Sequence, residues 1–523
     1  MGHLLSLLRS SSACSADNTV NRPARETGDD PPRPALRTLH VPSRVHVPMS
    51  ASPAILWFRR DLRLDANPAL AAAMARGPVI PLFILDPADR PGAASRWWLH
   101  GSLEALGESL ARLGAPLILR RGSPSEILPA LTAETDARAI FWNRLYEPHL
   151  IGRDKALKSA LTAQGIEVES FNGSLLAEPW QVRTQSGDPY KVFTPFWRSL
   201  AQMPFPAPHP APKKCAGLSP LPSDDLASWS LRPSKPDWAG GLRATWQPGE
   251  RAAQSRLAAF IDDAMVGYRE ARDIPAAEGT SRLSPHLHWG EVSPHRIWSA
   301  VEAATAAHPS GAEAGRAFLR ELAWRDFAHH LLFHWPDIAR ENWKSQFDAF
   351  PWKEDTAAFT AWTKGETGYP IVDAGMRQLW QTGWMHNRVR MIAASFLVKH
   401  LMVDWRRGAE WFENTLVDAD LAVNRASWQW VAGSGADAAP YFRIFNPVLQ
   451  GEKFDGDGAY VRAFVPELAK LDARFIHKPW AAPDAELSKA GIALGRTYPK
   501  PLVDHGHARA RALAAYEQIR NES

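Results

Sequence analysis

The chain has very little cysteine and no apolar run long enough to cross a bilayer. Its 523 residues include 2 cysteines, Cys14 and Cys215, which lie far apart in loop-like sequence. A disulfide framework is therefore not expected, which fits a reducing cytoplasm. Two thiols are also too few for an iron–sulfur cluster, which usually takes about four. Because a spanning helix needs roughly 20 consecutive apolar residues, none is expected here.

Several common motifs are missing as well. The sequence holds no Walker A motif and no G-x-S-x-G nucleophile elbow. The stretch "GSGADA" (Gly433–Ala438) matches G-x-G-x-x-A, but no strand pattern precedes it, so a Rossmann site is not predicted. His286, His288 and His295 lack an accompanying acid or cysteine pattern. We interpret them as surface or packing histidines and expect no metal site.

Charge and aromatic content leave the function open. The net charge of +4 and the isoelectric point of about 9.0 tolerate a polyanionic partner without requiring one. The chain has 23 Trp against 8 Tyr, which is unusual. Large helical cores would explain many of these tryptophans. Stacking or redox roles become plausible only where a tryptophan lies beside other site-like residues.

The pattern along the chain predicts two folded domains and a linker. Residues 1–50 show no sustained periodicity, so we expect a disordered extension, with Met49 as a candidate start. Across 51–180 strand-like runs alternate with helical patterns, which predicts an α/β domain with a doubly wound parallel sheet. Residues 181–250 are interpreted as an interdomain linker, because the sequence is Pro-rich over 201–250. Residues 251–523 are predicted to be all-helical, with helices over 251–267, 291–307, 312–335, 355–364, 372–382, 384–402 and 408–417.

Polar and aromatic side chains gather in "DADLAVNRASWQW" (Asp418–Trp430). On a helix, Asp420, Asn424 and Trp428 share one face, and Asp418 lies where an acid favours a helix start. An N-cap pair followed by a core tryptophan is the plainer alternative. However, "GWMHNRVRM" and "FLRELAWRDF" mix aromatics, amides and charges in the same way. Three such helices around one cavity would suit a large heteroaromatic cofactor.

A different pattern occurs in "GTSRLSPHL" (Gly279–Leu287). Three hydroxyl side chains follow a glycine just before a predicted helix. The free N–H groups at a helix start bind anions, so the segment could hold phosphates. A plain hydroxyl-rich turn fits the local sequence equally well.

Seven segments carry specific residue patterns: "LWFRRDLRLDANPAL", "GTSRLSPHLHWGEVSP", "ELAWRDF", "TGYPIVDAGMRQL", "GWMHNRVRM", "LVDADLAVNRASWQW" and "DAAPYFRIFNPVLQGEKFD". Together they resemble the photolyase/cryptochrome family. The resemblance covers roughly residues 54 to 480 in the family's order, and it is greatest to bacterial photolyases that are similar to plant cryptochromes. It implies an N-terminal α/β antenna-binding domain and a C-terminal helical domain that binds FAD and DNA.

The resemblance also implies which residues contact FAD. Asn424 would face the flavin N5, where an amide can both donate and accept a hydrogen bond. An ion pair between Asp418 and Arg390 would let the buried acid stay charged. Phe318 stands where some bacterial members have Trp. The implied FAD contacts are Tyr268, Thr280, Ser281, Arg282, Leu283, Ser284, Phe318, Asn387, Arg390, Asp418, Asp420 and Asn424.

For the substrate, the resemblance implies DNA with a flipped-out cyclobutane pyrimidine dimer. Trp324 and Trp430 would stack on the dimer. Members that repair the (6-4) photoproduct carry histidines at positions 387 and 391, so Asn387 and Met391 argue for cyclobutane dimers. The implied catalytic residues are Asn424, Glu321, Trp324, Asn387, Met391 and Trp430. The implied DNA contacts are Arg272, Glu321, Trp324, Arg325, Asn387, Arg388, Trp430, Arg443 and Gln450.

Electron transfer completes what the resemblance implies. Photoexcited reduced FAD would pass an electron to the dimer, and Trp428, Trp405 and Trp352 would carry electrons from the surface to an oxidised flavin.

The loop "NRLYEPHLIGRD" (Asn143–Asp154) resembles the family's antenna loop. A methenyltetrahydrofolate antenna is favoured, with 8-hydroxy-deazaflavin or an empty site as alternatives. A monomeric bacterial enzyme in the cytoplasm, associated with the nucleoid through DNA, is expected. The alternative function is a blue-light receptor of the cryptochrome type without repair activity.

Overall fold

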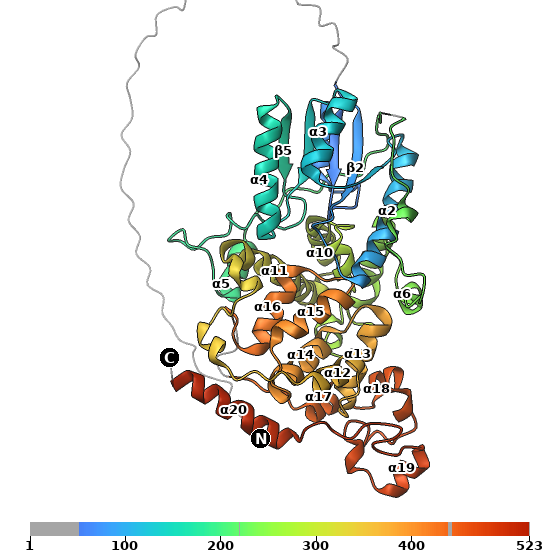
Figure 1. Cartoon of the computed structure of the whole chain (residues 1–523), viewed down its shortest axis with the longest axis vertical. Helices are drawn as coiled ribbons and strands as arrows, with labels where there is room; N and C mark the ends of the chain where they lie inside the picture. Colours follow the sequence, from blue (N-terminus) through green and yellow to red (C-terminus); the bar gives the residue numbers. More distant parts are fainter. Residues whose placement is uncertain (1–51, 219, 438–441, 522–523) are drawn as a thin grey trace, which may run out of the picture. The chain divides into compact units, whose positions relative to one another are not determined.

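The structure is a computed structural model, which describes residues 52–218, 220–437 and 442–521. The expectations for residues 1–50, a disordered extension and a start at Met49, lie outside these residues. Residues 50–523 form one compact unit. Within it a parallel sheet comes first along the chain and a group of helices follows (Figure 1).

The sheet has five parallel strands in the order β3-β2-β1-β4-β5. This confirms the predicted doubly wound parallel sheet. Because strand order reverses direction between β1 and β4, their carboxyl ends form the topological switch point where such sheets bind ligands. The strands span Ala54–Phe58 (β1), Val79–Leu85 (β2), Ile118–Arg121 (β3), Ala139–Asn143 (β4) and Glu167–Phe171 (β5).

Both faces of the sheet are covered, which explains its uninterrupted apolar strands. All five residues of β1 are buried. Its side chains alternate between two cores: Leu56 packs with the helices α1 and α2, and Trp57 packs with α3 and α4. The covering helices are α1 (Pro68–Arg76), α2 (Ala93–Leu113), α3 (Pro124–Thr135) and α4 (Pro148–Ala163).

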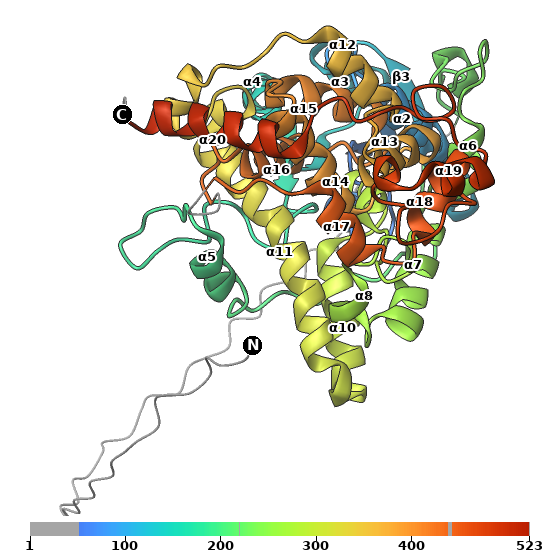
Figure 2. The ribbon, with the colours of Figure 1, turned by 90° about the horizontal axis from the view of Figure 1, so that it is seen from below.

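The predicted linker contains ordered structure of its own. It includes a short helix, α5 (Phe193–Leu200), a 3-10 turn at Leu226–Trp229 and α6 (Gly240–Thr245). The apolar side chains of α5 are buried together with those of the helix α11 (Ala312–His334). Figure 2 shows α5 beside α11.

The remaining helices largely follow the predicted pattern, with two differences. The helix predicted over 251–267 is interrupted by a π-turn at Phe260–Ala264. The helix predicted over 384–402 begins only at Asn387, because the His386 ring accepts the Arg388 N–H and caps the start, and after Ser395 it continues as a π-turn at Phe396–His400. The further helices are α7 (Glu250–Ala259), α8 (Tyr268–Ala271), α9 (Ser284–His288), α10 (Pro294–Ala307), α12 (Thr356–Lys364), α13 (Pro370–Thr382), α14 (Asn387–Ser395), α15 (Trp405–Thr415), α16 (Leu421–Ala432), α17 (Pro447–Phe454), α18 (Ala459–Phe464), α19 (Asp484–Ala490) and α20 (His505–Asn521).

In the ranges that the structure describes, no helix combines the length and apolarity that crossing a membrane requires.

Candidate functional site

The side chain of Trp384 joins the hydroxyl-rich segment to α14. Its indole Nε1 donates to the Ser284 hydroxyl over 3.4 Å. The guanidinium groups of Arg282 and Arg390 lie 5.2 and 6.0 Å from the Trp384 ring centroids. Trp384 is buried. It was not predicted as a site residue, although its position three residues before Asn387 in "GWMHNRVRM" was a signal.

The hydroxyl-rich segment passes α8 at close range. A Cβ added at Gly279 would lie 2.4 Å from the Cβ of Ala271, so only glycine fits there. Arg282 has a left-handed backbone, with φ of 48°. Leu283 is buried, while the side chains of Thr280 and Ser281 keep partial exposure. The helix that follows, α9, has only 5 residues.

The two acids at the start of α16 have different partners. Asp418 accepts two hydrogen bonds from the Arg390 guanidinium, at 2.8 and 3.1 Å, which is the predicted ion pair. Asp420 caps the helix by accepting the Val423 N–H, and its other oxygen lies 3.0 Å from His329 Nε2. Burial alone would raise the pKa of Asp420, but the charge and hydrogen bond of His329 hold it well below its usual range.

Asn424 has an amide orientation that its neighbours determine. Its Nδ2 donates to the Ala409 carbonyl over 3.0 Å and to Glu413 Oε1 over 3.3 Å. Glu413 also pairs with the Arg425 guanidinium at 2.9 Å. A carbonyl and a carboxylate can only accept, so the amide nitrogen must face them. The Asn424 Oδ1 has no hydrogen bond from the described part of the chain and stays free to accept one.

Two aromatic rings pack against each other between α8 and α11. Tyr268 and Phe318 are buried and meet edge to face, with ring centroids 5.5 Å apart. Burial raises the pKa of Tyr268 above its usual value, so the phenol stays neutral. The Arg272 guanidinium lies 5.4 Å from the Tyr268 ring centroid. These contacts place two residues with implied FAD contacts next to one with an implied DNA contact.

Two neighbouring residues after α8 connect α11 to α14. Arg272 pairs with Glu321 of α11 at 2.6 Å. Asp273 pairs with Arg388 of α14 at 2.8 Å. Arg388 also lies 4.4 Å from the ring centroid of Phe454. The structure therefore brings three of the implied DNA contacts into one cluster, and it adds Asp273 and Phe454, which sequence reasoning missed.

The other implied substrate residues lie on the same helices or close to them. Glu321 and Trp324 lie within one turn of α11, and Asn387 and Met391 lie one turn apart on α14. Trp324 keeps partial exposure and stacks on Phe193 of α5, with ring centroids 3.6 Å apart. The remaining members are Arg325, which donates to the Ser174 carbonyl, the partly buried Trp430 on α16, the exposed Arg443 and the partly buried Gln450 on α17.

The three tryptophans with an implied electron-transfer role differ in exposure. Trp428 and Trp405 are buried, whereas Trp352 is partly exposed. The Trp405 indole donates to Asn342 Oδ1 over 2.9 Å. A Cβ added at Gly408 would lie 2.2 Å from the Trp428 ring, so glycine lets α15 approach this indole. Trp362, which was not predicted, lies 6.2 Å from Trp428.

At the switch point of the sheet, arginines that follow β1 meet acids from the implied antenna loop. Arg59 pairs with Asp154, and Arg60 pairs with Glu147. The Arg59 guanidinium lies 4.8 Å from the Trp57 ring centroid. Although burial opposes it, the charge of Arg60 lowers the pKa of Glu147, so that this acid stays ionised.

The histidines His286, His288 and His295 are buried or partly buried among other protein groups. His286 Nδ1 forms a hydrogen bond with the Glu291 carboxylate, and His295 Nε2 donates to the Leu176 carbonyl. Burial and the charge of Arg60 lower the pKa of His288 to about 4, so it is neutral at pH 7. Within the described ranges, no group of three or more His, Cys, Asp or Glu side chains is arranged to hold a metal ion.

Comparison with known proteins gives two family models and close relatives. The model "DNA photolyase" matches residues 54–213, and "FAD binding domain of DNA photolyase" matches residues 318–518. A deoxyribodipyrimidine photo-lyase of Agrobacterium fabrum is 54% identical over 476 residues, which is 90% of this chain and 99% of the relative. Cryptochrome-1 of Arabidopsis thaliana is 40% identical over 89% of this chain and 70% of its own length.

A solved structure supports the same relationship. The crystal structure of a bacterial class III photolyase from Agrobacterium tumefaciens matches with a TM-score of 0.88 and 54% identity, over 92% of this chain and 100% of the other. The two matched regions correspond to the part of the chain that forms the sheet and to the helical part that follows it. The chain therefore belongs to the DNA photolyase family.

Proposed function

We propose that this protein is a light-dependent DNA-repair enzyme, a deoxyribodipyrimidine photo-lyase that splits cyclobutane pyrimidine dimers. Its 54% identity to such an enzyme along 90% of the chain is the observation that carries this proposal. The ion pairs from Arg272 and Asp273 add support, because they gather residues suited to DNA beside residues suited to FAD.

The side chains around Trp384 fit FAD. The hydroxyls of Thr280 and Ser281, together with the Arg282 guanidinium, are suited to a diphosphate. Arg390 and the two acids at the start of α16 supply the hydrogen bonds that a ribityl chain and a flavin ring edge require. When bound and reduced, FAD supplies an electron donor that light excites. The other residues that would contact FAD in this proposal are Tyr268, Leu283, Ser284, Phe318, Asn387 and Asn424.

Asn424 would favour a reduced flavin over an oxidised one. Its Oδ1 is free to accept, and its nitrogen is already engaged by Ala409 and Glu413. A flavin nitrogen that carries a proton can donate to this oxygen, whereas an unprotonated one cannot. In this proposal Glu413 fixes the amide, and Asn424 makes the contact.

The DNA side of the proposal uses stacking and charge. Trp324 and Trp430 stack on the extruded dimer, while Glu321, Asn387 and Met391 contact its base edges. Damaged base pairs are already weakened, so extrusion needs only a few kcal/mol. The positions of Arg272, Arg325, Arg388, Arg443 and Gln450 suit contacts to the DNA backbone, which predicts salt-sensitive binding with little sequence preference.

Electrons would reach the flavin site through Trp352, Trp405 and Trp428. The partial exposure of Trp352 and the burial of the other two are consistent with a path that starts at the surface. An antenna chromophore would lie at the switch point beside Arg59 and the 143–154 loop. We propose methenyltetrahydrofolate for it, with 8-hydroxy-deazaflavin as the alternative.

We also propose the organisation predicted from the sequence. Residues 51–180 form the antenna-binding domain, 181–250 the linker and 251–523 the catalytic domain, preceded by an extension over 1–50. The enzyme would act as a monomer on DNA in a bacterial cytoplasm.

The deciding experiment is light-dependent repair. Purified protein is reduced, mixed with an oligonucleotide that contains one thymine dimer, and illuminated with near-UV or blue light. Intact thymines should return only in the light, and Trp324→Ala with Arg388→Gln should abolish dimer binding while flavin absorbance is kept. Flavin photochemistry without recovered thymines would instead support the receptor alternative, which the 40% identity to a plant cryptochrome motivates.

A further inference from the structure

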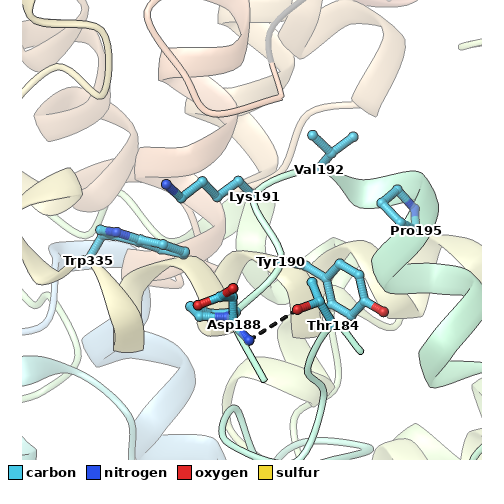
Figure 3. A pocket seen from close by; sticks show the side chains of 8 residues that line it. Thr184, Asp188, Tyr190, Lys191, Val192, Pro195 and Trp335 are labelled. Atoms are coloured by element: carbon cyan, nitrogen blue, oxygen red, sulfur yellow. Dashed lines mark hydrogen bonds between the residues drawn. The ribbon is translucent and has the colours of Figure 1, made fainter. Parts of the chain in front are cut away.

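Where the linker enters α5, the chain contacts two tryptophans: Trp324 within α11, and Trp335, the residue that follows the end of α11. The Lys191 Nζ lies 5.5 Å from the Trp335 ring centroid. Two residues later, Phe193 stacks on Trp324. Figure 3 shows Lys191 reaching toward Trp335 beside a pocket whose lining residues are Thr184, Asp188, Pro189, Tyr190, Lys191, Val192, Pro195 and Trp335.

The extended backbone at Val192 relates the two contacts. Val192 has backbone angles φ −130° and ψ 134°, so Lys191 and Phe193 point the same way. Trp324 lies within α11, whereas Trp335 follows its last residue and has a non-helical backbone, with φ −135° and ψ 75°. One extended stretch of chain thus contacts a ring of α11 and a ring just beyond its end.

The contact between Phe193 and Trp324 is closer and flatter than an ordinary aromatic contact. The ring centroids are 3.6 Å apart and the planes differ by 11°. Phe193 is 1% exposed, whereas Trp324 keeps partial exposure. One face of the indole is thus occupied by a buried ring, while the residue as a whole keeps partial exposure.

Phe193 is itself held from two directions. Its N–H donates to Asp437 Oδ2 over 3.0 Å, and Asp437 belongs to the segment that follows α16, the helix of Trp430. Its ring meets Phe327 of α11 edge to face at 5.7 Å. A side chain restrained in this way can fix the plane of the indole stacked on it.

We infer that Phe193 is a positioning residue for the lesion: it holds the Trp324 indole in the plane that stacks on an extruded pyrimidine dimer. This inference rests on the proposed function, in which Trp324 contacts the dimer. Phe193 does not touch the substrate and acts only through Trp324.

The test compares Phe193→Leu with a matched control, Phe196→Leu. Phe196 lies on the same helix, is also 1% exposed and contacts Phe327 and His330. Both variants are made with FAD bound, alone and with Trp324→Ala, and affinities for dimer-containing and undamaged oligonucleotides are measured. Phe193→Leu should lower dimer affinity about 3- to 10-fold, the range expected for one aromatic pair. Affinity for undamaged DNA and flavin absorbance should stay unchanged.

Two comparisons decide whether the effect passes through Trp324. With Trp324→Ala present, Phe193→Leu should have no further effect on dimer affinity. Phe193→Tyr, which keeps the ring, should stay within about twofold of the original protein. An equal loss in the Trp324→Ala background, an equal loss from Phe196→Leu, or no loss from Phe193→Leu overturns the inference. If Trp324→Ala alone leaves the dimer affinity unchanged, Trp324 does not contact the lesion as the proposed function requires, and the inference about Phe193 fails as well.

Discussion

Asp326 should make the protein less stable as the pH rises from about 4 to about 6. This carboxyl is buried on α11, where Oδ1 accepts the N–H of Leu176 at 2.6 Å and Oδ2 has no hydrogen bond within the described ranges. Burial raises its pKa from 3.8 to about 6, although Arg325 and the backbone N–H groups oppose the shift. The native state therefore holds a proton that the unfolded state has already released.

The size of the effect follows from that shift. A difference of about two pKa units corresponds to about 3 kcal/mol, at about 1.4 kcal/mol per unit. The stabilisation is complete below pH 4 and is lost as the pH rises through 6, and about half of the loss falls between pH 5 and 7. Asp326→Asn keeps the oxygen that accepts from Leu176 and removes the titration.

The assay is urea unfolding of the FAD-loaded protein at pH 5, 6, 7 and 8. The free energy of unfolding of the original protein should fall by about 1.5 kcal/mol relative to Asp326→Asn between pH 5 and 7. Asp337→Asn, an exposed change just beyond the same helix, should not alter the pH dependence. Parallel curves for the original protein and Asp326→Asn would refute the reasoning, because the buried carboxyl would then titrate as it does in the unfolded chain.

Further predictions concern the site itself. Arg390→Gln leaves the Asp418 carboxylate buried without its partner, so it should lower the free energy of unfolding by about 3 kcal/mol and reduce the flavin absorbance per protein. Glu413→Gln replaces the charged acceptor of the Asn424 amide by a neutral group that can also donate, so that only the Ala409 carbonyl still fixes the amide. Losing about 1.5 kcal/mol of preference for reduced flavin would lower the midpoint potential of a two-electron couple by about 30 mV in a redox titration. Arg388→Gln should weaken binding to damaged and undamaged DNA alike and reduce the slope of log K against log salt by about 1, as measured by fluorescence anisotropy.

The sequence predicts well what depends on local pattern. Unbroken apolar runs such as "AILWF" predict strands covered on both faces, and β1 is buried along its whole length. The ion pair of Asp418 with Arg390 could be predicted because the resemblance supplies both positions and a buried acid needs a cation. The π-turn at Phe260–Ala264 could not be predicted, because the composition of this stretch is that of an ordinary helix.

Contacts between distant residues account for most of what the sequence missed. Phe193 and Trp324 are separated by most of the linker and by the helices α7 to α10, and no periodicity connects them. Glu413 lies eleven residues from Asn424, but only the packing of α15 on α16 brings its carboxylate to the amide. Trp384 lies in "GWMHNRVRM", one of the segments that resemble the family. Its contacts to Ser284 and Arg282 depend on a turn roughly a hundred residues earlier.

The contacts that anchor α11 limit which fragments of this enzyme can keep the DNA site intact. Asp326 accepts from the N–H of Leu176, His330 Nδ1 donates to the Pro179 carbonyl, and Trp324 has Phe193 behind it. All three partners precede residue 201, so a fragment that starts at residue 251 would keep every implied FAD contact but lose these anchors of α11. Supplying the first half as a separate polypeptide should restore the missing anchors, which makes this protein a candidate for a split reporter whose reassembly is read out by dimer recognition.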